Sequence, residues 1–443
     1  MPENAQPARL SRTDRELLLH LLDTPTAGPL ETGGDGSAVQ LWEAGRAYAA
    51  AAGTLGFTVV RHAPADPAVL HRDDVPETVR EAAAREPGFL ACQPSLVLRL
   101  GPQLPHNATL MCNVHLDTVA GWWPARFDGT RFSGRGAIDA KGPAVALLAG
   151  IRAARAAEPA LGTRVGVLIQ AVAGEEGGAM GTFGTRPLVE QGFTGRLNLF
   201  CEPTGRRYLP RATASMTAGA HVRGEDAVDD RPEAGHNATV LLGHLSSHLA
   251  RTLPQRIADG RVCVAGVHTG QRHNRVYGTG QLLLNISYGS PAAGRAAEAA
   301  LRMSLREALT DFTALAAGTP DLARTAADAA AITSLRWYKR GLPALEDPGR
   351  NPWAEALLAD AGLAPWPADE PPFTCDAIWM NGIPDTYTAV LGPGHLGANR
   401  AHADGEYADA EELDGYADDI ARVLIGFTRQ ALRGTDAEET TTA

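Results

Sequence analysis

The sequence lacks several features that would place it in a particular class of protein. It has no block rich in lysine and arginine, and its formal net charge is −11. Both facts argue against nucleic acid or an anionic membrane as a partner. No apolar run approaches the length of a membrane span, and the N-terminal stretch MPENAQPARLSRTDRELL has no signal-peptide core. We therefore expect a soluble, cytoplasmic protein.

Cysteine is also scarce, with five residues in a chain of 443 and no close spacing between them. An odd number without close pairs gives neither a disulfide framework nor a CxxC metal site, and it suits a reducing compartment. The chain is too long for one hydrophobic core, so two domains are expected.

Apolar runs of strand length alternate with helical stretches in the outer parts of the chain. Strands are predicted at SLVLRL, ATLMCNVHL, VGVLIQAVA and LNLFCEP, and a helix at KGPAVALLAGIRAARAA. An N-terminal helix in TDRELLLHLLD is expected to have Thr13 as its cap, with Glu16 completing a capping box. Continuous apolar runs are typical of a mixed, mainly parallel sheet with helices on both faces.

The middle of the chain has a different pattern. From about Arg211 to Tyr338, strand-like pieces enclose the helical stretches HNATVLLGHLSSHLARTL and AAEAALRMSLREALTDFTALA. A helix–strand–strand–helix order with an added strand indicates an α+β insert. We therefore expect residues 1–210 and 339–443 to form one α/β domain, interrupted by an inserted domain at residues 211–338.

Five places put histidine, aspartate or glutamate just beyond an apolar strand or in a loop. They are NVHLDT with His115 and Asp117, GRGAIDAKG with Asp139, GEEGG with Glu175 and Glu176, FCEPT with Glu202, and ANRAHADGEY with His402. Taken singly, each has an ordinary explanation as a surface pair, a helix cap, a solvated turn or the end of a strand. Their joint placement changes this, because ligands of open α/β sheets gather beyond the carboxyl ends of the strands.

Two histidines and three carboxylates suit two Zn²⁺-like ions, especially if one carboxylate bridges them. A histidine that binds a metal usually has a carboxylate that orients its ring, and Asp117 lies near His115 for that role. Co²⁺ and Mn²⁺ accept the same donors as Zn²⁺.

These motifs, in this order, resemble a known family. HLDTV, GRGAIDAKG, GEEGG, CEPT and then GPG with AHADGEY are similar to motifs of the di-zinc metallopeptidases of aminoacylase, acetylornithine deacetylase, succinyl-diaminopimelate desuccinylase and carboxypeptidase G type. The similar stretch runs from about Leu110 to Tyr407, with TCDA and GIP as further matches. The domain pattern agrees, since that family carries a lid and dimerisation domain inserted in its catalytic domain.

The resemblance implies two metal ions. His115, Asp139 and Glu202 would hold one, and Asp139, Glu176 and His402 the other, with Asp139 as the bridge.

It also implies roles for the neighbouring residues. Asp117 would orient His115, and Glu175 would act as the general base in metal-assisted hydrolysis of an amide. The peptide bond between Asp139 and Ala140 is expected to be cis. A homodimer through the inserted domain is expected as well.

The sequence departs from the family where the substrate is expected to bind. Val228 stands where the family has a histidine that stabilises the oxyanion, and losing one such donor typically costs about 10²–10³ in rate. Ser287 stands where many members have an arginine for the substrate carboxylate. The candidate substrate-binding residues are Asn274, Arg275, Asp376 and Val228. We infer that the substrate is not an ordinary N-acyl amino acid with a free α-carboxylate.

Three functions are compatible with these features. The first is a metal-dependent amidohydrolase or peptidase that acts on a specialised N-acyl amino acid or peptide-like small molecule. The second keeps the metals but runs acyl transfer, amide formation or cyclisation. The third is a non-catalytic dimeric binding protein, which the intact Glu175 and the full ligand set disfavour.

Overall fold

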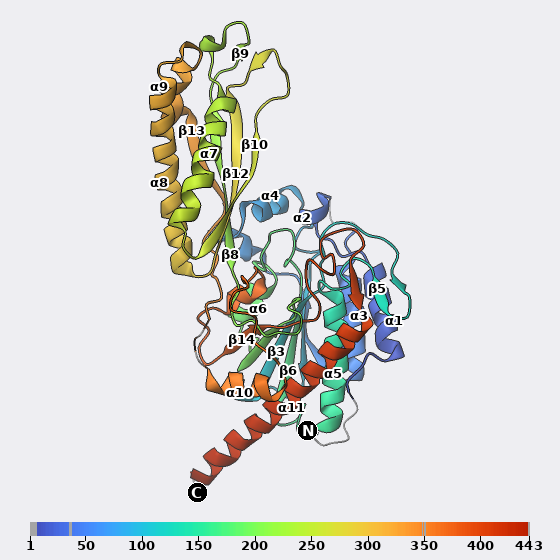
Figure 1. Cartoon of the computed structure of the whole chain (residues 1–443). Helices are drawn as coiled ribbons and strands as arrows, with labels where there is room; N and C mark the ends of the chain where they lie inside the picture. The colour runs from blue at the N-terminus through green and yellow to red at the C-terminus, as the bar shows by residue number, and fades with distance from the viewer. Residues whose placement is uncertain (1–6, 35–37, 348, 350, 442–443) are drawn as a thin grey trace. The chain divides into compact units, whose positions relative to one another are not determined.

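The computed structural model describes residues 7–34, 38–347, 349 and 351–441 (Figure 1). The chain forms two compact units. The first comprises Met1–Arg72, Thr78–Ala212 and Leu345–Ala443, and the second comprises Asp73–Glu77 and Thr213–Ala344. One unit is therefore interrupted in sequence by the other.

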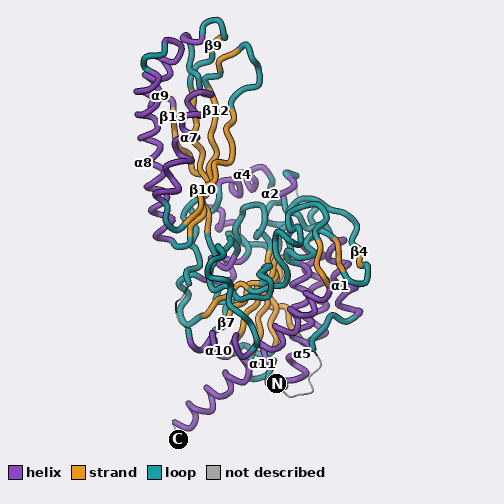
Figure 2. Tube along the Cα trace, in the orientation of Figure 1, coloured by secondary structure: helices purple, strands orange, loops and turns teal. Residues whose placement is uncertain are grey.

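A six-stranded sheet forms the centre of the first unit. Its strands are β1 Phe57–Ala63, β2 Ser95–Leu100, β3 Thr109–His115, β6 Gly166–Val172, β7 Leu197–Phe200 and β14 Tyr387–Val390. The order across the sheet is β1-β2-β6-β3-β7-β14. Strands are drawn in orange in Figure 2, where β7 is labelled. The pairs β6–β3, β3–β7 and β7–β14 are parallel, and the two pairs at the β1 edge are antiparallel. The predicted mixed, mainly parallel sheet is confirmed.

Helices cover both faces of this sheet. The helices outside the insert are α1 Arg12–Asp23, α2 Pro29–Thr32, α3 Leu41–Thr54, α4 Glu77–Arg85, α5 Lys141–Ala157, α6 Thr185–Glu190, α10 Pro352–Asp360 and α11 Ala410–Thr441. Leu110, Cys112 and Val114 of β3 belong to the core that α1, α3, α5 and α11 cover. Asn113 points to the opposite face, since side chains alternate along a strand. There its amide donates to Thr185 of α6.

The register of the sheet sets where the site forms. His115, the last residue of β3, pairs with Val172, the last residue of β6. Phe200, the last residue of β7, pairs with Asn113 of β3 and with Val390 at the end of β14. The carboxyl ends of four parallel strands therefore meet at one edge of the sheet, and the loops that follow them start side by side.

The second unit has an antiparallel sheet in the order β10-β12-β8-β13 and a separate two-stranded antiparallel sheet, β11-β9. Its elements are β8 Ala214–Arg223, β9 Ala227–Val228, α7 Ala238–Arg256, β10 Gly260–His268, β11 Arg275–Val276, β12 Thr279–Tyr288, α8 Pro291–Ala316, α9 Ala323–Ile332 and β13 Thr333–Lys339. The structure adds α9, β13 and the short strands β9 and β11 to the elements expected from the sequence. No helix in the described residues is both long and apolar enough to span a membrane.

A small three-stranded sheet lies in the first unit. Its strands are β4 Arg126–Phe127, β5 Arg131–Ser133 and β15 Tyr407–Asp409, in the order β15-β5-β4. Tyr407 pairs with Ser133, so this sheet joins the segment before α5 to the segment before α11.

The N-terminal helix begins two residues earlier than its predicted start. Ser11, not Thr13, is the cap, and the carboxylate of Asp14 accepts from the Ser11 backbone N–H at 2.7 Å to complete the capping box. Arg152 of α5 also donates to Asp14 at 3.0 Å. Asp14 is therefore bound from two sides, and these bonds favour a start at Ser11 over one at Thr13.

The Asp14 carboxylate should make the free energy of unfolding depend on pH in the acidic range. Burial alone would raise the pKa of Asp14, but hydrogen bonds from Arg152 and Ser11 outweigh burial and lower it below the ordinary 3.8. A lowered pKa in the folded state gives stability that is present above pH 3.8 and is lost as pH falls through the folded-state value. We expect Asp14→Asn to lower the free energy of unfolding by about 1.5–3 kcal/mol at pH 7.

Urea unfolding followed by circular dichroism between pH 7 and pH 3 measures this effect. The difference between wild type and Asp14→Asn should shrink below about pH 4, as the wild-type carboxyl group takes up its proton. Glu16→Gln in the same helix is the control, because its pair with Arg12 is exposed and should contribute less than about 0.5 kcal/mol. A difference that stays constant with pH would contradict the prediction.

Candidate metal centre

Four loops bring the predicted ligands to the carboxyl edge of the large sheet. His115 ends β3, Glu176 follows β6, and Glu202 follows β7. Asp139 lies just before α5, and His402 lies in the loop between β14 and β15. The peptide bond between Asp139 and Ala140 is cis, which confirms the expectation from the family.

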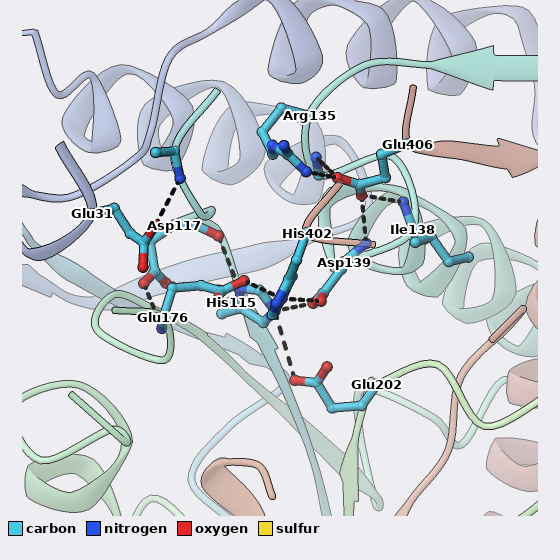
Figure 3. A network of polar contacts seen from close by, with 12 residues as sticks. Glu31, His115, Asp117, Arg135, Ile138, Asp139, Glu176, Glu202, His402 and Glu406 are labelled. Atoms are coloured by element: carbon cyan, nitrogen blue, oxygen red, sulfur yellow. Dashed lines mark hydrogen bonds and ion pairs between the residues drawn. The ribbon is translucent and has the colours of Figure 1, made fainter. Parts of the chain in front are cut away.

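Asp139 lies at the centre of this cluster (Figure 3). Its Oδ1 is 2.8 Å from His115 Nε2, and its Oδ2 is 3.0 Å from His402 Nε2. Glu176 Oε1 is 3.1 Å from His402 Nε2, and Glu202 Oε1 is 3.7 Å from His115 Nε2. The two oxygens of Asp139 thus face different histidines, each of which has a second carboxylate beside it.

The acidic groups of the cluster are mostly buried, and they outnumber its histidines. Asp117, Asp139, Glu176 and Glu202 are each at most 8% exposed, and Glu175 adds a half-buried carboxyl group. His115 and His402 oppose them in the cluster, and the buried Lys141 interacts with the charge of Asp117. Buried carboxylates without enough compensating charge are costly, and they persist where they are paired or bind a metal.

The pKa values reflect this crowding. Burial and then the Glu202 charge raise the pKa of Glu175 well above its ordinary value, and burial raises that of Glu176 to about 7. Contacts with Asp139 and Glu176 raise the pKa of His402 to about 10. Burial would lower the pKa of His115, but the carboxylates of Glu202 and Asp139 outweigh it and raise it.

The donor set fits a divalent cation. One possible ligand atom each of His115, Asp139 and Glu176 can be chosen so that all three lie within 4.8 Å of one another. Imidazole nitrogen with carboxylate oxygen suits zinc and its neighbours among the transition metals. A cation here would also offset the repulsion between the acids.

Asp117 contacts both His115 and the loop after β6, and its role in orienting the ring stays a prediction. Its Oδ1 lies 3.8 Å from His115 Nδ1. The Nδ1–H of His115 donates to the Asp117 backbone carbonyl at 2.9 Å, which leaves Nε2 free to face Asp139. The Asp117 carboxylate accepts from the backbone N–H groups of Gly174 and Glu176, at 3.0 and 3.1 Å. The carboxylate therefore holds the GEEGG loop, and the backbone carbonyl binds the histidine.

The four candidate substrate-binding residues do not lie together in one unit. Asp376 is in the first unit and fully buried, and it accepts a hydrogen bond from Thr185. It therefore offers no exposed surface to a substrate, and burial raises its pKa to about 7. Val228 is 58% exposed in the insert, where it pairs with Arg275, the residue after Asn274, in the two-stranded sheet β11-β9. Their substrate contacts stay predictions.

Sequence reasoning missed two buried residues that hold the cluster. Glu406 accepts hydrogen bonds from the loop that carries Asp139, and Lys141 donates from its Nζ to the carbonyls of Leu21 and Thr24 at 2.8 and 3.0 Å. Lys141 lies in the motif that contains Asp139, and Glu406 lies in the motif that contains His402. The sequence therefore shows that each is near a predicted ligand, but not which groups it binds.

Comparison with known proteins identifies the family. The family profile of peptidase family M20/M25/M40 matches residues 111–425. This chain belongs to that family. Its metal dependence agrees with the buried cluster around Asp139, and the chain is a metallopeptidase or hydrolase of the M20 type.

Individual relatives add detail. The chain is 31% identical over 178 residues to a putative LysW-lysine/LysW-ornithine hydrolase of Aeropyrum pernix, a match that covers 40% of this chain and 47% of that protein. The chain thus matches less than half of that relative's length. A tripeptidase of Staphylococcus aureus has a TM-score of 0.68 at 14% identity, covering 95% of this chain and 100% of its own. A metallo-carboxypeptidase of Sulfolobus solfataricus has a TM-score of 0.67 at 12% identity, with coverage of 95% and 100%. These two structures share the fold.

Metal removal from this M20 protein should lower its stability. We expect chelator-treated protein to melt several degrees below the same protein with excess Zn²⁺, since an ion that binds only the folded state stabilises it by mass action. Mg²⁺ should restore little, because imidazole donors favour transition metals. Differential scanning calorimetry with each ion measures the shift.

A pair of histidine variants sharpens the test. His402→Ala should lose most of the Zn²⁺-dependent shift. His248→Ala should keep it, because that buried histidine pairs with Asp311 in the insert at 3.2 Å. Equal Zn²⁺-dependent shifts in the two variants would show that His402 binds no ion.

Proposed function

We propose that this protein hydrolyses an amide bond of a specialised N-acyl amino acid or peptide-like small molecule, with Glu175 as the general base. The position of Glu175 carries the proposal. It directly precedes Glu176 in the loop after β6, and it is partly exposed, whereas the carboxylates of Glu176 and Glu202 are buried. A partly accessible carboxyl group beside a metal centre can reach a reacting water.

We further propose two ions, zinc in the native protein, with Asp139 as the bridge. His115 and Glu202 would hold one ion, and Glu176 and His402 the other. Support comes from the two Asp139 oxygens, which lie 2.8 and 3.0 Å from different histidines. When bound, such ions would polarise the scissile carbonyl and make a nearby water more acidic.

The protein's own residues would then carry out the proton transfers. Glu175 would accept the proton of the attacking water and return it to the leaving nitrogen. A raised pKa suits this second step, because a carboxyl group that holds its proton more tightly remains a competent acid near neutral pH. Asp117 would keep Glu175 in place through its bonds to Gly174 and Glu176.

For the substrate, we propose an amide that releases lysine or ornithine. The Aeropyrum pernix relative is named for that activity. We also propose a cytoplasmic homodimer that forms through the insert, which rests on the family resemblance.

Acyl transfer to an amine remains a second candidate because of Val228. A valine donates no hydrogen bond, so the oxyanion would lack the donor that the family pattern provides there. In such a site an amine could compete with water for the acyl group. Hydrolysis in ¹⁸O-labelled water with and without added lysine separates the two functions. Hydrolysis places one label in the acid product, and transfer gives a new amide without label.

Glu175→Gln should lower kcat about 10²–10⁴-fold and leave metal content unchanged, since glutamine keeps the shape but cannot accept the proton. Glu190→Gln is the control, because Glu190 is a half-exposed residue of α6 that pairs with Arg72. Turnover and metal analysis on the same preparations test this. Retention of full activity by Glu175→Gln would exclude it as the base.

The substrate proposal has its own test. The test compares amides that share one acyl group and release lysine, ornithine or leucine. We expect kcat/KM for the amides that release lysine or ornithine to exceed that for the leucine amide about 10-fold or more, within the range of a pocket that recognises the side-chain amine. Mass spectrometry of the products measures both rates. Equal rates for all three would reject the substrate class and leave the hydrolytic mechanism untouched.

A further inference from the structure

One buried carboxylate connects the two loops that carry Asp139 and His402. These residues are proposed to share one ion, yet they lie in separate segments, before α5 and between β14 and β15. Glu406, four positions after His402, is 1% exposed. Its side chain reaches from the second loop into the first (Figure 3).

The contacts of Glu406 use both of its oxygens. Oε1 accepts from the backbone N–H groups of Ile138 and Asp139, at 3.1 and 3.2 Å. Oε2 accepts from the N–H of Gly136 at 3.1 Å and from Nη1 of Arg135 at 2.8 Å. One carboxylate therefore binds the turn that presents Asp139 at four points. Hydrogen bonds to an ionised acceptor are also stronger than neutral ones.

The backbone of the same residue continues the connection. The Glu406 carbonyl accepts from the N–H of Gly134 at 3.2 Å, and the next residue, Tyr407, pairs with Ser133 between β15 and β5. Main chain and side chain thus hold the same two loops together.

His402 needs such support because its backbone is unusual. Its φ of 63° lies in the left-handed region, which residues other than glycine seldom adopt. Its side chain is also 52% exposed, so little packing holds the ring in place. Such a conformation persists only where the surrounding contacts determine it. Glu406 lies close enough in sequence to supply that constraint.

We propose that Glu406 is a positioning residue, which sets metal affinity by fixing the Asp139 turn against the His402 loop. This inference rests on the proposed metal centre. It assigns Glu406 no contact with substrate or metal. Without the hydrogen bonds of Glu406, Asp139 and His402 would have to become ordered when the ion binds. The free-energy cost of that ordering would weaken metal binding.

The test is metal affinity, measured on metal-free protein by competition with a chromophoric chelator, with Zn²⁺ as the probe. Residues that orient metal ligands typically affect affinity about 10–100-fold when changed. We expect Glu406→Gln to bind one Zn²⁺ about 10–100-fold more weakly than wild type. The amide keeps the shape but has one acceptor oxygen for four donors.

Asp14→Asn is the matched control. Asp14 is likewise a buried carboxylate that accepts from a backbone N–H and from an arginine, but neither partner is in a ligand loop: Ser11 caps α1, and Arg152 lies in the second half of α5, well beyond its first turn. It should lose stability and bind Zn²⁺ within about twofold of wild type. Wild-type Zn²⁺ affinity in a folded Glu406→Gln, or an equal loss of affinity in Asp14→Asn, would overturn the proposal.

Two further outcomes are distinguishable. If Glu406→Gln does not fold, Glu406→Asp decides, because its shorter side chain cannot span both loops and should also weaken Zn²⁺ binding about 10-fold. Wild-type affinity in that variant would overturn the proposal. If the wild-type protein itself binds no Zn²⁺, Co²⁺ or Mn²⁺, the proposed metal centre fails, and the role of Glu406 fails with it.

Discussion

The Asp139 carboxylate lies between two histidines from distant parts of the chain, and much of the surrounding structure supports this arrangement. His115 is held by strand β3, whereas His402 stands in a loop with a left-handed backbone. Asp139 can face both only if its own turn is fixed, and Glu406 binds that turn through backbone N–H groups. The buried acids around it raise one another's pKa, so the cluster favours whatever cation can offset their charge.

The sheet explains why so few residues suffice to build the cluster. Parallel strands start their following loops at one edge, and the register places the ends of β3, β6 and β7 within a few residues of each other. A loop of modest length then brings Glu176 and Glu202 to His115. The adjacent glutamates of GEEGG serve different purposes because neighbouring side chains diverge on a turn. One is buried against His402, and the other remains partly accessible.

Much of this was predictable from the sequence, and the failures have a common cause. Continuous apolar runs predicted the strands, and the acidic and histidine positions after them predicted which side chains meet. The contacts of Asp117 were not predictable in detail, because both the carbonyl and the carboxylate of one residue can approach the same histidine and only the fold places them. Ser11 rather than Thr13 caps the helix, because Asp14, which completes the capping box with Ser11, is also held by Arg152. That contact joins two helices far apart in sequence. The partners of Glu406 lie about 270 residues away, beyond the reach of any local pattern.

The interruption of the first unit has a consequence for synthesis of the chain. Domains generally fold as units as they leave the ribosome. Here β3, β6 and β7 are made first, the whole insert follows, and only then do β14 and His402 arrive. Until that point β7 has no neighbour on one side, and such an unpaired edge can associate with other strands. The nascent chain therefore carries an unfinished sheet, and acidic residues that still lack His402, until the insert has been made.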